Sequence, residues 1–384
     1  MKVFISVDME GTSGLERLEE IFRGLPGFDR FRRLMAGDAN AVVQGAIEGG
    51  ADEIVVSDSH GYMCNINPDD LVPGVRLKRG QLRRRWCQMK GFESDFDAVL
   101  LVGFHAKAGN ADAILSHTWI TSFLDVRVNG QSVPEPSLNT WLAGAFGVPV
   151  VMLSGDDQVI AEASPVMGDI HYAQLKKSTG YFSGEHLPLD ESRRLLRETA
   201  RDAVRDARRF TPVRAELPVT IELDLSPDAV EATPLGARVG DNQRFVDRAW
   251  GDEPLSDVDL ALATHPVTTS PQPGTIAFTC EDFPTAYATL HSILGEVATG
   301  CVARARSTSL SGSSPQTRST NRWLSPTRAP SGVASTASGE RSSSIVTGSS
   351  ARTGLKRRAS RTASRAVSRR SRRLSSRGRC SPLK

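Results

Sequence analysis

Short runs of apolar residues recur along the first part of the chain and predict the strands of a sheet. Val3–Val7, Ile54–Ser57, Val99–Gly103 and Val148–Leu153 are rich in Val, Ile and Leu, and helix-like stretches separate them. Apolar runs of this length predict parallel strands that are buried on both faces. We therefore predict an α/β fold with a largely parallel sheet flanked by helices. The full expected fold class adds a second smaller α+β lobe and a disordered C-terminal tail, which rest on the patterns described below.

Other patterns predict the elements between and after these runs. Residues Asp29–Glu48 place apolar side chains at helical spacing, and Gly49 and Gly50 end that helix. The dipeptide Asn129-Gly130 predicts a hairpin turn, because both residues tolerate a positive φ. The basic stretch 78–90 resembles a solvated connector. Four more elements are expected, namely a short helix over 138–146, a helix over 191–209, a strand over 219–225 and an amphipathic helix over 282–297.

The charge balance changes sharply near residue 300. Residues 1–300 contain 28 Lys and Arg against 43 Asp and Glu, whereas residues 301–384 contain 19 against a single acid, Glu340. The acidic part disfavours nucleic acid as its own partner, and a small molecule or a peptide fits it better. The basic part is rich in Ser and Arg and lacks a periodic apolar pattern, so we expect it to be disordered.

Cysteine usage and hydropathy bear on the compartment. The five cysteines are widely spaced and contain no CxxC pair. Their odd number argues against a disulfide framework and favours a reducing compartment. We find no signal-peptide pattern and no run of roughly 18 apolar residues that would span a bilayer. We therefore expect no membrane partner and a cytoplasmic location.

Acids and histidines follow three of the predicted strands. Asp8 and Glu10 follow the first run, Asp58 and His60 the second, and His105 the third. Each motif alone is also typical of solvated acids or structural histidines. Since open α/β sheets bind ligands at the carboxyl ends of their strands, we expect these side chains to converge on one crevice.

Mixed carboxylate and imidazole ligands suit zinc, or another first-row divalent ion such as manganese. A centre of two metal ions needs about five ligands with one bridging carboxylate. The chain offers that number, and Glu135, just after the predicted hairpin, is the natural fifth ligand.

Several of these motifs together carry a resemblance to a known family. The chain resembles the D-aminopeptidases of the DppA type, peptidase family M55, through at least residues 1–190. The resemblance rests on SVDMEGTSG (6–14), SDSHG (57–61), GFHAKAG (103–109), SHT (116–118), VPEPSLN (133–139) and GDD (155–157), which occur in the family's order and at similar spacing.

This resemblance implies a zinc aminopeptidase with two zinc ions per subunit that removes N-terminal D-amino acids from short peptides. It implies ring-like homo-oligomers as well. By position, the implied zinc ligands are Asp8, Glu10, His60, His105 and Glu135, and His117 matches the catalytic histidine. The resemblance places Asp58 and Asp156 either beside the ligands, where carboxylates orient metal-bound imidazoles, or at the edge of the sheet.

The chain departs from the family pattern at the fifth ligand. Pro134 and Pro136 enclose Glu135, where the family usually has glycines. Proline fixes its own φ and favours an extended conformation for the residue before it. If Glu135 needs another backbone conformation, the second zinc site is compromised.

The basic tail has two explanations. It either binds nucleic acid through its charge, or is an out-of-frame translation of GC-rich sequence; we favour the second, because the family-like final helix breaks off near Gly300. The expected organisation is a metal-binding catalytic domain (1–160), a second lobe that completes the subunit (161–300) and the tail (301–384). The alternatives to the aminopeptidase are a binuclear metallohydrolase of another amide or phosphoester, and an inactive homologue whose tail binds nucleic acid.

Overall fold

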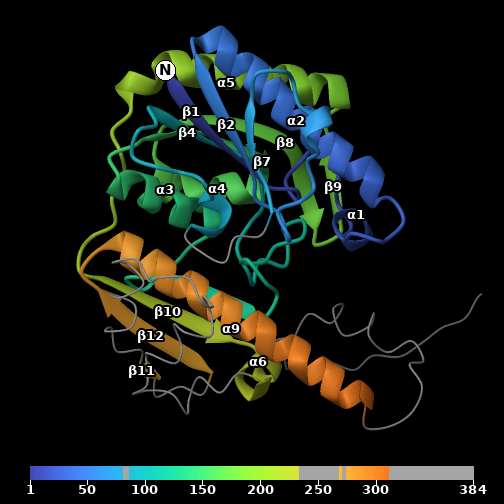
Figure 1. Cartoon of the computed structure of the whole chain (residues 1–384), viewed down its shortest axis with the longest axis vertical. Coiled ribbons are helices and arrows are strands. Elements are labelled where there is room, and N and C mark those ends of the chain that lie inside the picture. Colours follow the sequence, from blue (N-terminus) through green and yellow to red (C-terminus); the bar gives the residue numbers. More distant parts are fainter. Residues whose placement is uncertain (81–85, 233–267, 270–273, 311–384) are drawn as a thin grey trace, which may run out of the picture. The chain divides into compact units, whose positions relative to one another are not determined.

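A mostly parallel sheet forms the centre of the computed structural model, which describes residues 1–80, 86–232, 268–269 and 274–310 (Figure 1). Its strand order is β3-β2-β1-β4-β7-β8-β9, in which only β9 runs antiparallel to its neighbour. The strands are β1 (Lys2–Val7), β2 (Glu53–Asp58), β3 (Arg76–Lys78), β4 (Ala98–Phe104), β7 (Val150–Asp156), β8 (His171–Gly180) and β9 (Ser183–His186). The four predicted apolar runs form its central strands, which confirms the predicted fold class.

Helices cover both faces of this sheet because successive side chains of each strand point to opposite faces. In β1, Val3 and Ile5 pack into the core beneath helices α2 (Phe28–Gly49) and α5 (Leu189–Asp206), whereas Phe4 packs into the core on the other face. Helices α3 (Glu135–Ala145) and α4 (Asp157–Met167) lie on that second face. The sheet is thus buried on both faces, as the continuous apolar runs predict.

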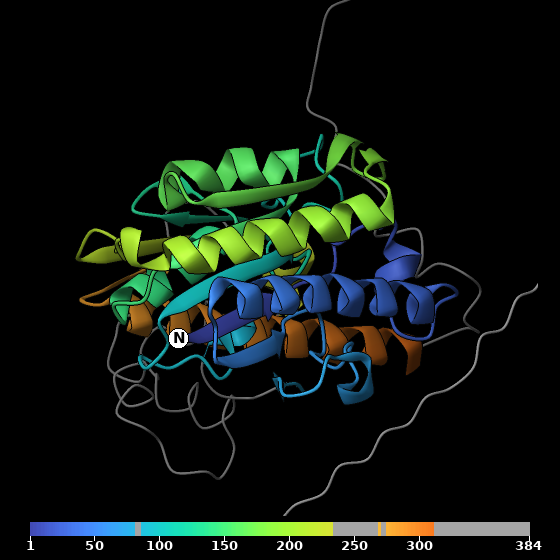
Figure 2. The same cartoon turned by 90° about the horizontal axis from the view of Figure 1, so that it is seen from above.

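Helices α2 and α5 lie side by side along the sheet (Figure 2). Gly45 of α2 makes this approach possible, since a Cβ atom there would lie 2.1 Å from the carbonyl oxygen of Arg197. The predicted end of α2 is confirmed, because Gly50 adopts the left-handed conformation, with φ of 105°, and caps the helix. The sequence of α2 therefore determines both its end and its close packing.

A smaller antiparallel sheet follows the order β11-β12-β10-β5-β6 among the described residues. Asn129 and Gly130 form the predicted turn between β5 and β6, with φ angles of 51° and 80°. Helix α9 packs against this sheet and against α3. The elements are β5 (Phe123–Val128), β6 (Gln131–Ser132), β10 (Val219–Leu225), α6 (Pro227–Ala232), β11 (Thr268–Thr269), β12 (Thr275–Cys280) and α9 (Phe283–Leu310).

Short helical turns connect the larger elements. They are α1 (Leu18–Ile21) and the 3-10 turns η1 (Pro68–Asp70), η2 (Cys87–Met89) and η3 (Ala207–Arg209). Turn η2 lies within the stretch expected to be a solvated connector, yet Gln88 and Lys90 are 4% and 5% exposed. The expectation is wrong for this part of the stretch, because η2 packs beneath the ends of β1 and β2.

The expected boundary at residue 160 does not follow the division between the two sheets. It falls inside α4, and β8 and β9 beyond it extend the larger sheet, whereas β5 and β6 before it belong to the smaller one. Hydrophobic pattern predicts a strand but not the strand with which it pairs, so the sequence placed β8 in the second lobe.

Helix α9 continues to Leu310, past the expected start of the tail at residue 301. Extending a formed helix costs far less free energy than starting one, which composition alone does not reveal. The rest of the tail lies outside the described residues, as does most of the interval 233–273. Within the described part of the chain, no helix is both long and apolar enough to cross a membrane.

Candidate metal centre

The carboxyl ends of three neighbouring strands place acids and imidazoles together. Strand β1 lies between β2 and β4, and all three run in parallel. Asp8 and Glu10 follow β1, His60 follows β2 and His105 follows β4. The convergence expected from the sequence is therefore present in the structure.

The side chains form three overlapping groups whose ligand atoms lie within 4.8 Å of one another. Two of these groups share the carboxylate of Asp8, which suits a pair of adjacent ions with one bridging ligand. The groups are Asp8, Glu10 and His60; Asp8, His105 and Glu135; and Glu10, His105 and His117.

The two oxygens of Asp8 face different imidazoles. Its Oδ1 lies 3.6 Å from Nδ1 of His60, and its Oδ2 lies 3.5 Å from Nε2 of His105. The same His60 nitrogen is 2.9 Å from Oε2 of Glu10, and the same His105 nitrogen is 3.5 Å from Oε1 of Glu135. Asp8 thus lies between a Glu10–His60 pair and a His105–Glu135 pair.

Backbone carbonyls fix the orientation of each imidazole. His60 donates from Nε2 to the carbonyl of Ile21 at 3.0 Å, and His105 donates from Nδ1 to its neighbour Ala106 at 2.9 Å. His117 donates from Nδ1 to Leu115 at 2.8 Å. In the neutral form of each ring, the nitrogen that faces the acids is therefore the one with the free lone pair, as a metal ligand requires.

Glycine at position 103 permits the close approach of β4 to the end of β1. Gly103 has φ of +72°, and a Cβ atom there would lie 2.5 Å from the carbonyl oxygen of Asp8. Any other residue would need both a left-handed backbone and more room. Gly103 therefore helps to set the distance between Asp8 and His105.

The two prolines around Glu135 are compatible with its place in the centre. Pro134 is the N-cap of α3, with φ of −78° and ψ of 164°, and Pro136 occupies the first turn, where a helix makes no use of the missing N–H. Glu135 opens the helix and is 1% exposed. The prolines thus define the start of α3 and leave the carboxylate beside His105.

Burial and charge shift the protonation of these groups. Burial, followed by the charge of Asp8, raises the pKa of Glu135 to about 8. Burial and Glu10 also raise the pKa of Asp8. Burial also raises the pKa of Glu10, but the charge and the hydrogen bond of His60 outweigh burial, so the pKa of Glu10 is well below its ordinary value. The same pair holds the pKa of His60 well above its ordinary value.

Three carboxyl groups that are at most 2% exposed lie together with three imidazoles. Burying like charges is costly unless a cation or a proton compensates them. The oxygen and nitrogen donors match those of zinc sites. The residues present therefore fit divalent metal ions.

Asp58 supports a loop and Asp156 caps a helix, and no hydrogen bond joins either carboxylate to an imidazole in the described part of the chain. Asp58 accepts hydrogen bonds from the backbone N–H groups of Asn65 and Ile66, and the Asn65 side chain also donates to the carbonyl of His60. Asp156 caps α4 through the N–H of Val159. Asp58 therefore holds the backbone that carries His60, which differs from the role expected from the sequence.

Sequence reasoning missed several polar residues around the centre. Lys176 of β8 is 2% exposed, and its ammonium group donates to the carbonyls of Glu10 and Leu15 at 2.5 and 2.6 Å. Gln88 donates to Glu135, and the N–H of Trp119 donates to the same carboxylate at 2.6 Å. No local motif marks these residues; a polar residue next to buried strands is the only signal that the sequence offers.

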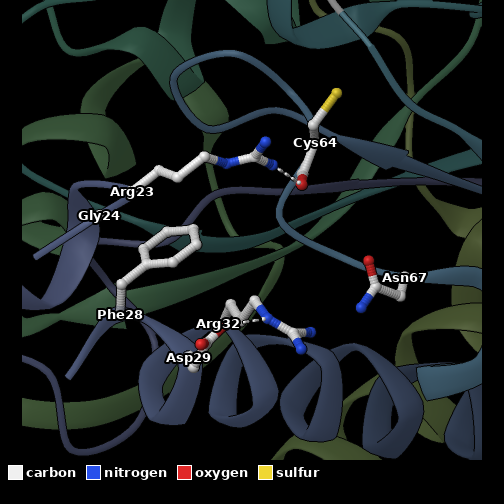
Figure 3. Close-up of a pocket in the computed structure, with 7 residues that line it drawn as sticks. All are labelled: Arg23, Gly24, Phe28, Asp29, Arg32, Cys64 and Asn67. Carbon is white, nitrogen blue, oxygen red and sulfur yellow. Dashed lines mark hydrogen bonds and ion pairs between the residues drawn. The ribbon is translucent and has the colours of Figure 1, made fainter. Parts of the chain in front are cut away.

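A pocket lies beside the segment that joins α1 to α2 (Figure 3). Its two arginines are already paired: Arg23 donates to the carbonyl of Cys64, and Arg32 pairs with Asp29. The residues that line it are Arg23, Gly24, Phe28, Asp29, Arg32, Cys64 and Asn67. The pocket contains none of the metal-centre residues.

A parallel sheet whose strand ends carry buried carboxylates and oriented imidazoles defines an α/β metalloenzyme. The family model described as D-aminopeptidase (Peptidase_M55) matches residues 1–242, and the chain belongs to this family. This membership confirms the resemblance noted in the sequence and the prediction of a metallo-aminopeptidase.

Two relatives illustrate the similarity. A D-aminopeptidase of Bacillus subtilis (strain 168) is 30% identical over 213 residues, which cover 56% of this chain and 77% of the relative. A solved structure described as the Zn-dependent D-aminopeptidase DppA from Bacillus subtilis, a self-compartmentalizing protease, matches with a TM-score of 0.65 and 23% identity. The match covers 78% of this chain and 98% of that chain, and it shows that the two share a fold.

Proposed function

We propose that this chain is a zinc-dependent aminopeptidase that removes N-terminal D-amino acids from short peptides at a centre of two metal ions. The observation that carries the proposal is the shared carboxylate of Asp8, which faces His60 through one oxygen and His105 through the other. Family membership supports the aminopeptidase activity, and the zinc dependence of the DppA protein that shares this fold supports zinc.

Asp8, Glu10 and His60 would hold one ion, and Asp8, His105 and Glu135 would hold the other. Ions bound there supply Lewis acidity, which polarises the scissile carbonyl and acidifies water. The protein contributes the fixed direction of each donor, because carbonyl oxygens hold the far nitrogen of each ligand imidazole.

His117 is suited to moving a proton during the reaction. Its Nδ1 is occupied by the carbonyl of Leu115, so only Nε2 is free to accept or donate a proton. That nitrogen lies 3.7 Å from Oε1 of Glu10, and the side chain is 18% exposed, against 2% for His105. His117 can therefore meet a peptide, accept a proton from the attacking water at Nε2 and pass it to the departing amine.

Two further features belong to this proposal. A homo-oligomer is expected, since the similar structure is described as self-compartmentalizing. A cytoplasmic location is expected from the cysteine pattern of the sequence.

The test is hydrolysis of D-alanyl and L-alanyl p-nitroanilides by protein purified without chelator, with zinc counted on the same sample. The proposal predicts about two zinc ions per chain and D-selective turnover that is lost in Glu135→Ala and His117→Ala. Glu185→Ala, which removes an exposed carboxylate of β9, is the matched control and should retain activity.

Other outcomes select the alternatives. Bound metal without turnover of either substrate would indicate a hydrolase of another amide or of a phosphoester. A protein that binds no metal but binds DNA in a salt-dependent manner would indicate an inactive homologue with a nucleic-acid-binding tail.

A further inference from the structure

Gln88 lies where β1, β2 and α3 meet, and its backbone is fixed. Its carbonyl oxygen accepts hydrogen bonds from Ser6 Oγ at 2.8 Å and from Ser59 Oγ at 3.0 Å. The side-chain Nε2 donates to Oε2 of Glu135 and lies 3.5 Å from Oδ2 of Asp8. Gln88 thus contacts two of the proposed ligands from outside the ligand set.

The direction of the Gln88 carboxamide is set by the groups at its other end. Its Oε1 accepts from Asn139 Nδ2 at 3.0 Å and from Trp119 Nε1 at 3.4 Å. Because an amide donates only through nitrogen, two donors at the oxygen turn the NH2 group toward the carboxylates.

Asn139 is oriented in the same way by helix α9. Its Oδ1 accepts from the hydroxyl of Tyr287 at 2.7 Å, so its NH2 group faces Gln88. Tyr287 is fully buried, and its ring packs against Trp86 and Trp119. A hydrogen-bonded chain with a single direction therefore runs from Tyr287 through Asn139 and Gln88 to Glu135.

This chain ends on one particular oxygen of Glu135. Oε2 accepts from Gln88, whereas Oε1 faces Nε2 of His105 at 3.5 Å and accepts the N–H of Trp119. Without Gln88, the Oε2 atom would lose this donor, and the carboxylate would keep only the hydrogen bond from the N–H of Trp119. It would then gain freedom to rotate about its terminal bond. The His60 side of the centre would keep its own hydrogen bonds.

We infer that Gln88, oriented by Asn139 and Tyr287, is a positioning residue for Glu135, so that helix α9 helps to build the His105–Glu135 side of the metal centre. The inference rests on the proposed function. Helix α9 would thereby have a role at the metal centre, although it lies about 150 residues along the chain from Glu135 and contributes no proposed ligand. Partners of metal ligands typically change metal affinity or activity by about 10- to 100-fold.

The test compares Tyr287→Phe with Tyr172→Phe, a matched control that removes a hydroxyl bonded to the carbonyl of Gly168. Each zinc-loaded protein is dialysed against a competing chelator, and the zinc released is followed with time. Tyr287→Phe should lose one of its two ions about 10-fold faster than wild type and show a similar fall in kcat/KM. Tyr172→Phe should match the wild type in both measurements.

A double variant separates positioning from general support of the fold. If Tyr287 acts through Gln88, Tyr287→Phe should add nothing further to the effect of Gln88→Met on zinc release, whereas independent structural effects would add. Three results would each overturn the inference. The two substitutions could have additive effects on the rate of zinc release, Tyr287→Phe could release both ions faster to the same extent, or Tyr287→Phe could release zinc at the wild-type rate. If wild-type protein itself holds fewer than two ions, the proposed function fails and this inference fails with it.

Discussion

The imidazole rings of His105 and His117 are stacked, with their centroids 4.0 Å apart and their planes inclined by 8°. Both rings donate through Nδ1 to backbone carbonyls, yet their Nε2 atoms face different acids. That of His105 lies 3.5 Å from Asp8 and Glu135, and that of His117 lies 3.7 Å from Glu10. The stack thus places a proposed ligand directly beside a proposed proton carrier.

Replacing His117 should separate these two roles. His117→Gln should lower kcat by about 10²- to 10⁴-fold, the usual contribution of a general acid or base, while both zinc ions stay bound. His171→Gln is the matched control, since His171 pairs with Asp206 instead. Loss of zinc from His117→Gln would show that His117 is a ligand, as its place in a group with Glu10 and His105 also permits.

The activity should persist below the pH at which a free histidine gains its proton. Burial, followed by the neighbouring His105, lowers the pKa of His117 from its ordinary value of 6.5. A lowered pKa means that the imidazole stays neutral to a lower pH, and nearby cations would act in the same direction. The acid limb of kcat/KM should therefore lie below pH 6.5 and be absent from His117→Gln; a limb above that pH would contradict the assignment.

Zinc should stabilise the fold, and the Asp8→Asn variant should lose this effect. Burial and Glu10 raise the pKa of Asp8 in the metal-free protein, so its ionised form at pH 7 disfavours folding. Metal-free Asp8→Asn should therefore unfold at the same or a higher temperature than metal-free wild type. Free zinc at 100 times its Kd should stabilise only the wild type, by about 2.7 kcal/mol for each ion bound.

These unfolding temperatures can be measured by calorimetry after chelation and again after zinc is restored. Equal stabilisation of the wild type and Asp8→Asn by zinc would show that Asp8 does not bind the metal.

Lys176 should be essential for the loop that carries Glu10. Its ammonium group donates to the carbonyls of Glu10, Thr12 and Leu15, and Lys176→Met would leave these oxygens without that donor. We expect the free energy of unfolding to fall by about 3 kcal/mol in urea denaturation. Lys177→Met is the control, because Lys177 is exposed on the opposite face of β8; equal losses in the two variants would refute this role.

The contacts of Glu135 show where sequence reasoning was sufficient and where it was not. The motif around it predicts a ligand, but the neighbouring prolines left its backbone conformation open. In the structure they fall at the N-cap and in the first turn of α3, where proline costs no helical hydrogen bond. Its partner Gln88 could not have been predicted, since the stretch around it resembles a solvated connector.

The sequence by itself determined the central strands and the residues at their ends. Strands that run in parallel share one edge at their carboxyl ends, so Asp8, Glu10, His60 and His105 could be placed together from local pattern alone. It also determined the Asn129-Gly130 turn, because positive φ is a property of those two residues.

Only the tertiary structure decided which distant elements complete the centre. The pairing of β8 with β7, which brings Lys176 beneath the loop of Glu10, has no local signature. The same holds for the chain from Tyr287 to Glu135. The physical reason is that a buried polar side chain is defined by its partner across the fold, and periodicity along the sequence carries no information about that partner.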